Sequence, residues 1–201
     1  MTDHAVVANH HANHQGFSGL GGLIAALTML VGRIDSARLA AALCGAGPGD
    51  VVIDVGCGPG AAARHAGRLG ATVTGVDPSH IMLRVARALP RRGVRYVEGT
   101  AEALPAAAAS ATVVWSIATV HHWHDIDAGL TEVRRVLQPG GRFVAIERAR
   151  RPDARGLASH GWTSEQAATF AVRCATHGLV DVQTQTHAAG RSTLSVLATE
   201  P

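Results

Sequence analysis

The sequence contains no lysine, and its eighteen basic residues are all arginines scattered along the chain. With a formal net charge of only +3, the chain is mildly basic, and we expect no binding to a polyanion such as nucleic acid. Aromatic residues make up 3% of the sequence, which excludes a dedicated single-strand binder because such proteins stack bases on aromatic rings. The 201 residues, 47% of them hydrophobic, suffice for one compact domain.

Cysteine is also scarce. Cys44, Cys57 and Cys174 lie far apart and form no C-x-x-C pair, which favours a reduced, cytoplasmic setting. For Cys57 we favour a packing role over a nucleophilic one. The N-terminus carries Asp3 and histidines where a signal peptide needs basic residues, so we expect no cleaved leader.

Charged residues are absent between residues 16 and 32, a stretch of seventeen residues that includes five glycines. This length is at the short limit for a membrane span, so we expect no stable membrane insertion. We interpret the stretch as an apolar helical lid over a pocket, with loose membrane association as the alternative. The predicted organisation is an N-terminal helical lid segment over residues 1–45 and a single main domain over residues 46–201.

Short apolar runs alternate with helical patterns along the main domain, which predicts a mostly parallel sheet with helices on both faces. The expected strands are 51–55, 71–76, 93–98, 112–117 and 142–147, and the expected helices are 59–69, 79–89 and 126–137. An earlier helix ends at Cys44, with Asp35 or Ser36 as its N-cap. A capping box at Thr163–Gln166 begins a last helix that runs to His177. Alternating runs at 179–187 and 192–199 follow as an antiparallel hairpin. The predicted fold is therefore α/β, a single doubly wound, mostly parallel seven-stranded sheet with an antiparallel C-terminal hairpin.

The most informative stretch is residues 51–60, Val-Val-Ile-Asp-Val-Gly-Cys-Gly-Pro-Gly. A buried strand here ends in Asp54 and is followed by glycines that permit a turn close to a ligand. Pro59 suits the first turn of a helix. Strand, turn and helix together place several unpaired N–H groups at one spot, which suits an anionic or strongly polar ligand.

Two acids distinguish between nucleotide ligands at this turn. Asp77 lies at the end of the next strand, where a carboxylate can bind both ribose hydroxyls; capping the helix that follows is the alternative role. The sequence Gly56-Cys57-Gly58-Pro59-Gly60-Ala61 satisfies the loose pattern of an NAD(P) site. Asp54, however, would repel a pyrophosphate and attract a cation, so S-adenosylmethionine, with its sulfonium and ammonium groups, fits better.

Five segments in order resemble the class I, Rossmann-like S-adenosylmethionine-dependent methyltransferases, in particular the type 11 small-molecule subfamily. They are Val52–Gly60, Thr74–Ser79, Glu98–Pro105, Ser116–Asp125 and Glu132–Gly141. The resemblance covers residues 50–147 and implies S-adenosyl-L-methionine as cofactor, S-adenosyl-L-homocysteine as product, and a small, partly hydrophobic methyl acceptor that receives the methyl group by in-line displacement.

The resemblance also implies the roles of single residues. The backbone of Gly56, Cys57 and Gly58 would hold the methionine part, with Asp54 near its ammonium group and the carbonyl of Ser116 close to the same group. Asp77, followed by Pro78, would hold the ribose. Thr100 and Ala101 would line the adenine, although the family usually has Asp where Thr100 stands, and a shorter, uncharged side chain there predicts weaker binding.

Histidines provide the candidate for proton transfer. We expect His121, just past the strand that carries Ser116, to act as a base or to orient the acceptor. Glu147 would contact the acceptor or pair with an arginine. The histidine clusters at 10–14 and 121–124 show no recognised metal-ligand spacing, so we predict no metal. An NAD(P)-dependent oxidoreductase and a non-catalytic S-adenosylmethionine-binding module remain the alternatives.

Overall fold

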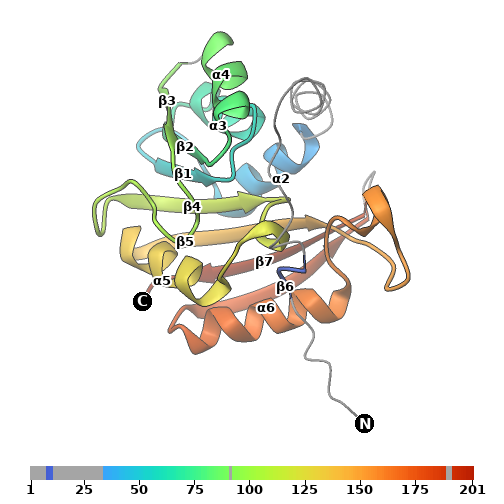
Figure 1. Cartoon of the computed structure of the whole chain (residues 1–201). Coiled ribbons are helices and arrows are strands. Elements are labelled where there is room, and N and C mark those ends of the chain that lie inside the picture. The colour runs from blue at the N-terminus through green and yellow to red at the C-terminus, as the bar shows by residue number, and fades with distance from the viewer. Residues whose placement is uncertain (1–7, 11–33, 91, 189–191) are drawn as a thin grey trace.

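The computed structural model describes residues 8–10, 34–90, 92–188 and 192–201; the helix expected over 17–31 lies outside these ranges. Seven strands form one sheet in the order β3-β2-β1-β4-β5-β7-β6 (Figure 1). Strand pairing is parallel from β3 through β5 and antiparallel between β5, β7 and β6, as predicted. The strands are β1 (Val51–Val55), β2 (Thr72–Asp77), β3 (Val94–Glu98), β4 (Ala111–Ile117), β5 (Leu137–Arg148), β6 (Val180–His187) and β7 (Thr193–Thr199).

Helices cover both faces of this sheet, each with its own hydrophobic core. One face carries α2 (Ile34–Cys44), α3 (Ala61–Arg68) and α4 (His80–Ala88), whose buried positions are mostly alanines. Alanines let these helices pack close to the valines of β1 and β2. The other face carries α5 (Ile126–Val136) and α6 (Ser164–Thr176), and two short 3₁₀ helices complete the fold, η1 (Val120–His122) and η2 (Gly156–Ser159).

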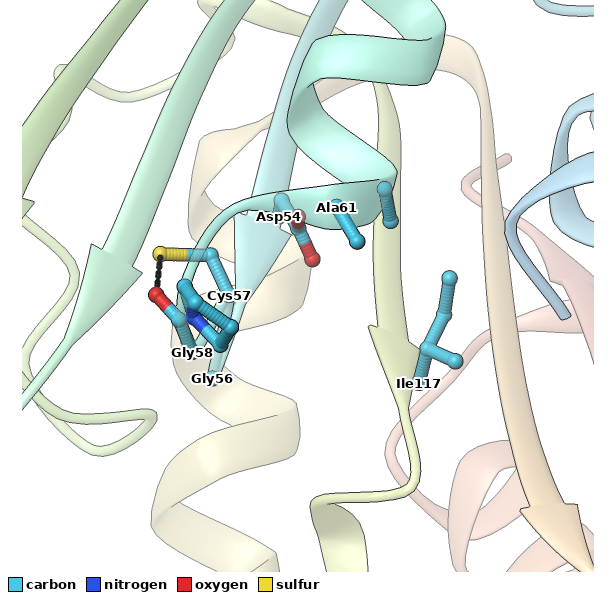
Figure 2. A pocket seen from close by; sticks show the side chains of 8 residues that line it. Asp54, Gly56, Cys57, Gly58, Ala61 and Ile117 are labelled. Carbon is cyan, nitrogen blue, oxygen red and sulfur yellow. Dashed lines mark hydrogen bonds between the residues drawn. The ribbon is translucent and has the colours of Figure 1, made fainter. Parts of the chain in front are cut away.

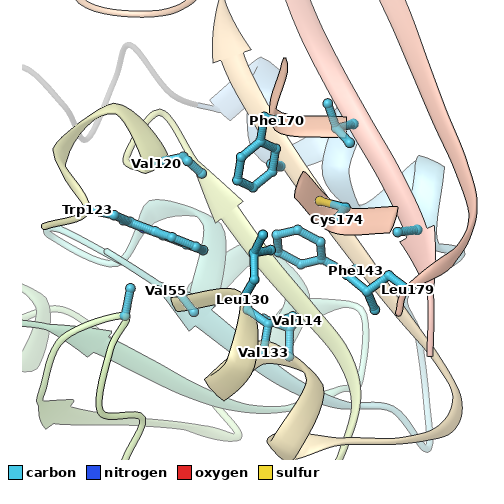
Figure 3. Packing of buried hydrophobic residues seen from close by; sticks show 14 of the residues in the cluster. Val55, Val114, Val120, Trp123, Leu130, Val133, Phe143, Phe170, Cys174 and Leu179 are labelled. Carbon is cyan, nitrogen blue, oxygen red and sulfur yellow. The ribbon is translucent and has the colours of Figure 1, made fainter. Parts of the chain in front are cut away.

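Larger side chains fill the core under α5 and α6 (Figure 3). Phe170 of α6 lies at its centre, with ring centroids 4.9 Å from Trp162 and 6.2 Å from both Trp123 and Phe143. Trp123, which directly follows η1, is part of this core as well. The capping box at Thr163 and Gln166 is present at the start of α6 as predicted.

Three local predictions were wrong. Helix α2 already includes Asp35 and Ser36, so Asp35 lies in its first turn, where an acid favours the positive end of the helix dipole. Helix α3 begins at Ala61, so Pro59 precedes its N-cap residue, Gly60. Strand β5 begins at Leu137 because Gly140 and Gly141 exchange backbone hydrogen bonds with Glu200 and extend the ladder.

Among the described helices, none has the length and apolarity needed to cross a membrane.

Candidate functional site

The sheet has its topological switch point between β1 and β4, where the chain connections diverge to opposite sides. In open α/β sheets, ligands bind beyond the carboxyl ends of the strands at this point. Asp54 is the last residue but one of β1, and Gly56 follows that strand. Asp77 ends the neighbouring β2, and Ser116, the last residue but one of β4, is in register with Val55. The predicted cofactor residues on these three strands therefore meet at one edge.

The turn after β1 differs from our expectation of unpaired N–H groups. The N–H groups of Gly56 and Cys57 both donate to the carbonyl of Val76, at 2.8 and 3.0 Å, and that of Gly58 donates to Asp77 Oδ2 at 2.8 Å. These bonds hold the turn against β2. The three N–H groups are therefore used within the protein and do not point at a ligand. The N–H groups that remain for an anion are those at the start of α3, whose N-cap residue, Gly60, has no side chain to cap them.

Asp77 connects two loops. Its Oδ1 accepts from the Ser79 N–H at 2.9 Å while Oδ2 accepts from Gly58, and the side chain is 8% exposed. Ser79, not Asp77, is the N-cap of α4, because its hydroxyl accepts from the Met82 N–H. The capping alternative for Asp77 is therefore wrong. Pro78, next in the chain, is exposed at the rim.

Asp54 lies in a hollow between the turn and the first residues of α3 (Figure 2). The side chains of Asp54, Ala61 and Ile117 point into this hollow, and Asp54 is 1% exposed. A carboxylate at one side and the positive end of a helix at the other present opposite charges to one small space. This arrangement suits a zwitterion such as the amino-acid end of a ligand, with its ammonium group toward Asp54 and its carboxylate toward α3.

Cys57 packs in the same turn as a protonated thiol. Burial, together with the negative charges of Asp54 and Asp77, raises the pKa of Cys57 well above its ordinary value. Because the thiolate is the reactive form, this thiol is not a nucleophile at neutral pH. The packing role predicted for Cys57 agrees with this environment.

Thr119 supports the turn from below, and the sequence reasoning missed it. Its hydroxyl donates to the Val55 carbonyl at 3.0 Å and lies 2.5 Å from the hydroxyl of Ser116. A Cβ on Gly56, where φ is +70°, would lie 2.5 Å from the methyl group of Thr119. The backbone at Gly56 therefore lies so close to Thr119 that only glycine fits. Ala118, with φ of +55°, makes the strained bend between β4 and Thr119. Ser116 is fully buried and paired on both sides, to Val55 and Ala145.

The residues expected around adenine lie after β3. Thr100 is half-buried and Ala101 is buried, and a short turn closes between Thr100 and Ala103. Glu102 accepts from the N–H groups of His124 and Asp125, so this turn is joined to the loop after β4. Thr112, near the start of β4, takes part in a structural network, because its hydroxyl donates to Asp50 at 2.7 Å.

His121 and Glu147 form a buried pair at the carboxyl ends of β4 and β5. The ring Nδ1 lies 2.9 Å from both carboxylate oxygens, and the backbone N–H of His121 also donates to Oε1 at 3.4 Å. Glu147 is 0% exposed and His121 is 2% exposed. Glu147 therefore pairs with a histidine, not with the arginine we considered. With Nδ1–H donating to the carboxylate, the lone pair of the ring is on Nε2.

Three further histidines surround this pair. His160 Nδ1 lies 3.3 Å from His121 Nε2, and the His122 ring centroid lies 4.1 Å from that of His121. His10 stacks on His121 at 5.9 Å and is held by the Ser159 carbonyl and by Gln166. Desolvation by burial lowers the pKa of His10. His124, three positions after His121, is exposed, and His11 and His14 lie outside the described residues.

These residues fit S-adenosylmethionine better than a dinucleotide. The cradle at Gly56 and Gly58, the buried Asp54 and the start of α3 match the zwitterionic methionine end, and Asp77 lies next along the same edge for the ribose. A pyrophosphate would meet the carboxylate of Asp54 at close range, which is repulsive.

Comparison with known proteins agrees with this fit. Residues 53–145 match the type 11 family described as "Methyltransferase domain". Ubiquinone biosynthesis O-methyltransferase of Agrobacterium fabrum is 36% identical over 110 residues, which cover 53% of this chain and 44% of that protein. Malonyl-[acyl-carrier protein] O-methyltransferase of Erwinia billingiae is 42% identical over 96 residues, covering 48% and 38%. The chain thus spans less than half the length of these curated relatives.

The fold itself has close structural counterparts. A SAM-dependent methyltransferase from Aquifex aeolicus superposes with a TM-score of 0.75 at 16% identity, over 89% of this chain and 98% of that one. Its strand order, its glycine turn with two acids and the domain matched over residues 53–145 make this chain similar to the class I, type 11 S-adenosylmethionine-dependent methyltransferases.

Proposed function

We propose that this chain transfers a methyl group from S-adenosylmethionine to a small, partly hydrophobic acceptor. The observation that carries the proposal is the buried carboxylate of Asp54 facing the positive end of α3, with Asp77 beside it at the end of β2. Asp54 would hold the ammonium group, α3 the carboxylate, and Asp77 the ribose hydroxyls. The closed turn of Gly56, Cys57 and Gly58 would contact the methionine part through its shape and its carbonyls.

Adenine would lie beyond the ribose, against Ala101 and beside Thr100. Ala101 offers a buried apolar contact, and the hydroxyl of Thr100 can make a single hydrogen bond where a carboxylate could make more. The Ser116 carbonyl would add a second contact to the ammonium group. Pro78, at the exposed rim, would cover one side of the ribose.

When bound, the sulfonium supplies an activated methyl group and a good leaving group, so the chemistry needs alignment in a site that excludes water. Held by Asp54, the start of α3 and Asp77, S-adenosylmethionine would supply the methyl group to the acceptor atom, and its sulfur would keep the electron pair of the carbon–sulfur bond. The proton lost by the acceptor goes to His121 Nε2. Because His121 is 2% exposed, half-buried His160, 3.3 Å away, is the group through which the proton would reach it.

Glu147 would act as a positioning residue. It holds the Nδ1–H tautomer of His121 and stabilises the imidazolium that forms when Nε2 accepts a proton. A base contributes about 10²–10⁴-fold to a proton-transfer step. His121→Gln should therefore lower kcat within that range while it leaves the Kd for S-adenosylmethionine unchanged. An acceptor that is already deprotonated would need no base, and kcat would then not fall.

Binding tests the proposal directly. Isothermal titration of the full chain should show binding of S-adenosylmethionine and not of NADH. Asp54→Asn removes one charge-assisted hydrogen bond, worth about 1.5–3 kcal/mol, and should weaken S-adenosylmethionine about 10- to 100-fold. Asp153→Asn, at an exposed position, is the matched control. If this were an oxidoreductase site, Asp54→Asn would instead strengthen dinucleotide binding, because it removes a charge that repels the pyrophosphate.

Turnover separates an enzyme from a binding module. A metabolite screen should reveal S-adenosylhomocysteine formed only with an acceptor present, whereas binding without product would refute catalysis. Two relatives are named O-methyltransferases, so hydroxyl- and carboxyl-bearing acceptors come first in the screen.

The N-terminal lid stays a prediction, and the contacts of residues 8–10 decide how it is best tested. Ala8 accepts from the Trp162 indole N–H, and Asn9 donates to the carbonyl of Trp123, so residues 8–10 are seated beside the His121 cluster. Deleting residues 1–32 would remove these buried contacts together with the proposed lid, so the deletion would not test the lid alone. Replacing residues 11–32 by an equally long Gly/Ser segment should spare cofactor binding and abolish turnover; unchanged turnover would contradict a lid.

A further inference from the structure

We propose that His121, His122 and His160 form a binding site for a divalent transition-metal ion of the Zn²⁺ type. One ligand nitrogen from each ring lies within 4.8 Å of the other two. The three residues come from η1 and from the loop before α6, and His121 and His160 are 39 positions apart in sequence. No sequence spacing reveals such a site, because only the fold brings the rings together.

The closest pair already has the spacing that a metal requires. Zn²⁺ binds imidazole nitrogen at about 2.0–2.1 Å, and a tetrahedral angle then separates two ligand nitrogens by about 3.3–3.4 Å. His121 Nε2 and His160 Nδ1 are 3.3 Å apart. The ligand nitrogen of His122, within 4.8 Å of the other two, must approach by at most about 1.5 Å, and both His122 and His160 are half-buried.

Glu147 adds the second feature of a histidine metal site. Histidines that bind metals almost always donate their other ring N–H to a carboxylate, a backbone carbonyl or a water, which sets the tautomer and increases ligand basicity. His121 Nδ1 lies 2.9 Å from both oxygens of Glu147. Glu147 is fully buried, and a buried carboxylate is stabilised by nearby positive charge, which a dication supplies. Three imidazoles favour Zn²⁺, Co²⁺, Ni²⁺ or Cu²⁺ over Mg²⁺ and Ca²⁺, which prefer oxygen ligands.

His10 is not part of the site although it stacks on His121. Its Nε2 bonds to the Ser159 carbonyl at 3.0 Å and its Nδ1 to the Gln166 amide at 3.1 Å, so both ring nitrogens are used. His10 instead packs beside the cluster and limits the movement of the His121 ring.

Metal binding has a consequence for turnover, and that consequence rests on the proposed function. His121 Nε2 has a single lone pair, so it cannot hold a metal and accept a proton at once. A bound ion should therefore suppress turnover with acceptors that must lose a proton, and a chelator should restore it. The cluster would thus make methyl transfer sensitive to the concentration of free transition metal.

The binding test uses the full chain without a purification tag, stripped with a chelator. Titration with Co²⁺ should give visible absorption of tetrahedral type that saturates at one equivalent, Zn²⁺ should displace it, and Mg²⁺ should not bind. His160→Ala, at a half-buried position, should abolish this absorption. Glu147→Gln should weaken Co²⁺ about 10- to 100-fold. His124→Ala, at an exposed position, and the double variant His11→Ala/His14→Ala should bind as the parent does.

Absence of saturable Co²⁺ binding, or equal binding by the parent and His160→Ala, would overturn the proposal. Circular dichroism of each variant shows whether a loss reflects unfolding. Metal binding is measured without S-adenosylmethionine, so a negative result there does not bear on the proposed function. The proposed function fails separately, if the metal-free protein does not bind S-adenosylmethionine. Turnover that stays constant as Zn²⁺ saturates the protein would refute the competition for Nε2.

Discussion

Replacing Gly60 by alanine tests how tightly the glycine turn is built. Gly60 has φ of +78°, and a Cβ there would lie 2.2 Å from the hydroxyl oxygen of Tyr96 and 2.6 Å from its ring. Tyr96 is buried, so its ring must move into packed surroundings. Gly140 has nearly the same φ, +76°, with nothing within 4 Å of its Cβ position, and is the matched control.

The two substitutions share one cost and differ in another. The left-handed conformation costs alanine about 1–2 kcal/mol, offset by about 0.4–1 kcal/mol from the stiffer unfolded chain. Gly140→Ala should therefore destabilise the protein by about 0–1.6 kcal/mol. Gly60→Ala adds the overlap with Tyr96, and overpacking of this kind costs about 1–3 kcal/mol. At about 2–4 °C per kcal/mol for a chain of this size, its Tm should fall roughly 2–12 °C further than that of Gly140→Ala.

Thermal unfolding followed by circular dichroism measures both variants. A cycle with Tyr96→Ala identifies the cause, because removing the ring should recover most of the excess cost of Gly60→Ala. Equal Tm values for the two glycine variants would refute the reasoning, as would a Tyr96→Ala background that leaves the excess unchanged.

Three further substitutions have defined outcomes. Asp77→Asn leaves one acceptor oxygen for the N–H groups of Gly58 and Ser79, so the free energy of unfolding measured in urea should fall by about 1.5–3 kcal/mol. Titration should also show weaker S-adenosylmethionine binding. A variant as stable as the parent would contradict the bridging role of Asp77. Phe170→Ala should cost about 3–5 kcal/mol by the same measurement, against less than about 0.5 kcal/mol for exposed Val172→Ala. Burial alone would raise the pKa of Asp50, but hydrogen bonds from Thr112 and the Gly47 N–H and the Arg142 guanidinium lower it below its usual value. A lowered folded pKa stabilises the protein above the unfolded pKa of about 3.9, and this contribution disappears as pH falls through the folded value. Asp50→Asn should therefore be less stable than the parent at pH 7 and converge with it below about pH 4; a gap that stays constant from pH 7 to pH 3 would show that ionisation of Asp50 plays no part.

Local patterns in the sequence were sufficient for the order and type of the elements. Strand β1 is a run of β-branched residues, and α6 begins at a capping box, so short-range chemistry alone predicts both. Positions next to strand ends follow from the same reasoning, which is why Asp54, Asp77 and Ser116 were found. The sequence could not show that Trp123 packs against Phe170, because that contact depends on how α6 docks on the sheet.

The sequence by itself determined which segments are helices and strands, because a period of two or of 3.6 residues is a local property. It also determined which acids stand at the strand ends. Tertiary structure alone decided which groups face one another. It closed the turn by pairing its N–H groups with Val76 and Asp77, where local reasoning left them open. It also brought His160 to His121 and buried Glu147 against the other side of the His121 ring, because residues distant in the chain meet only when the whole fold forms.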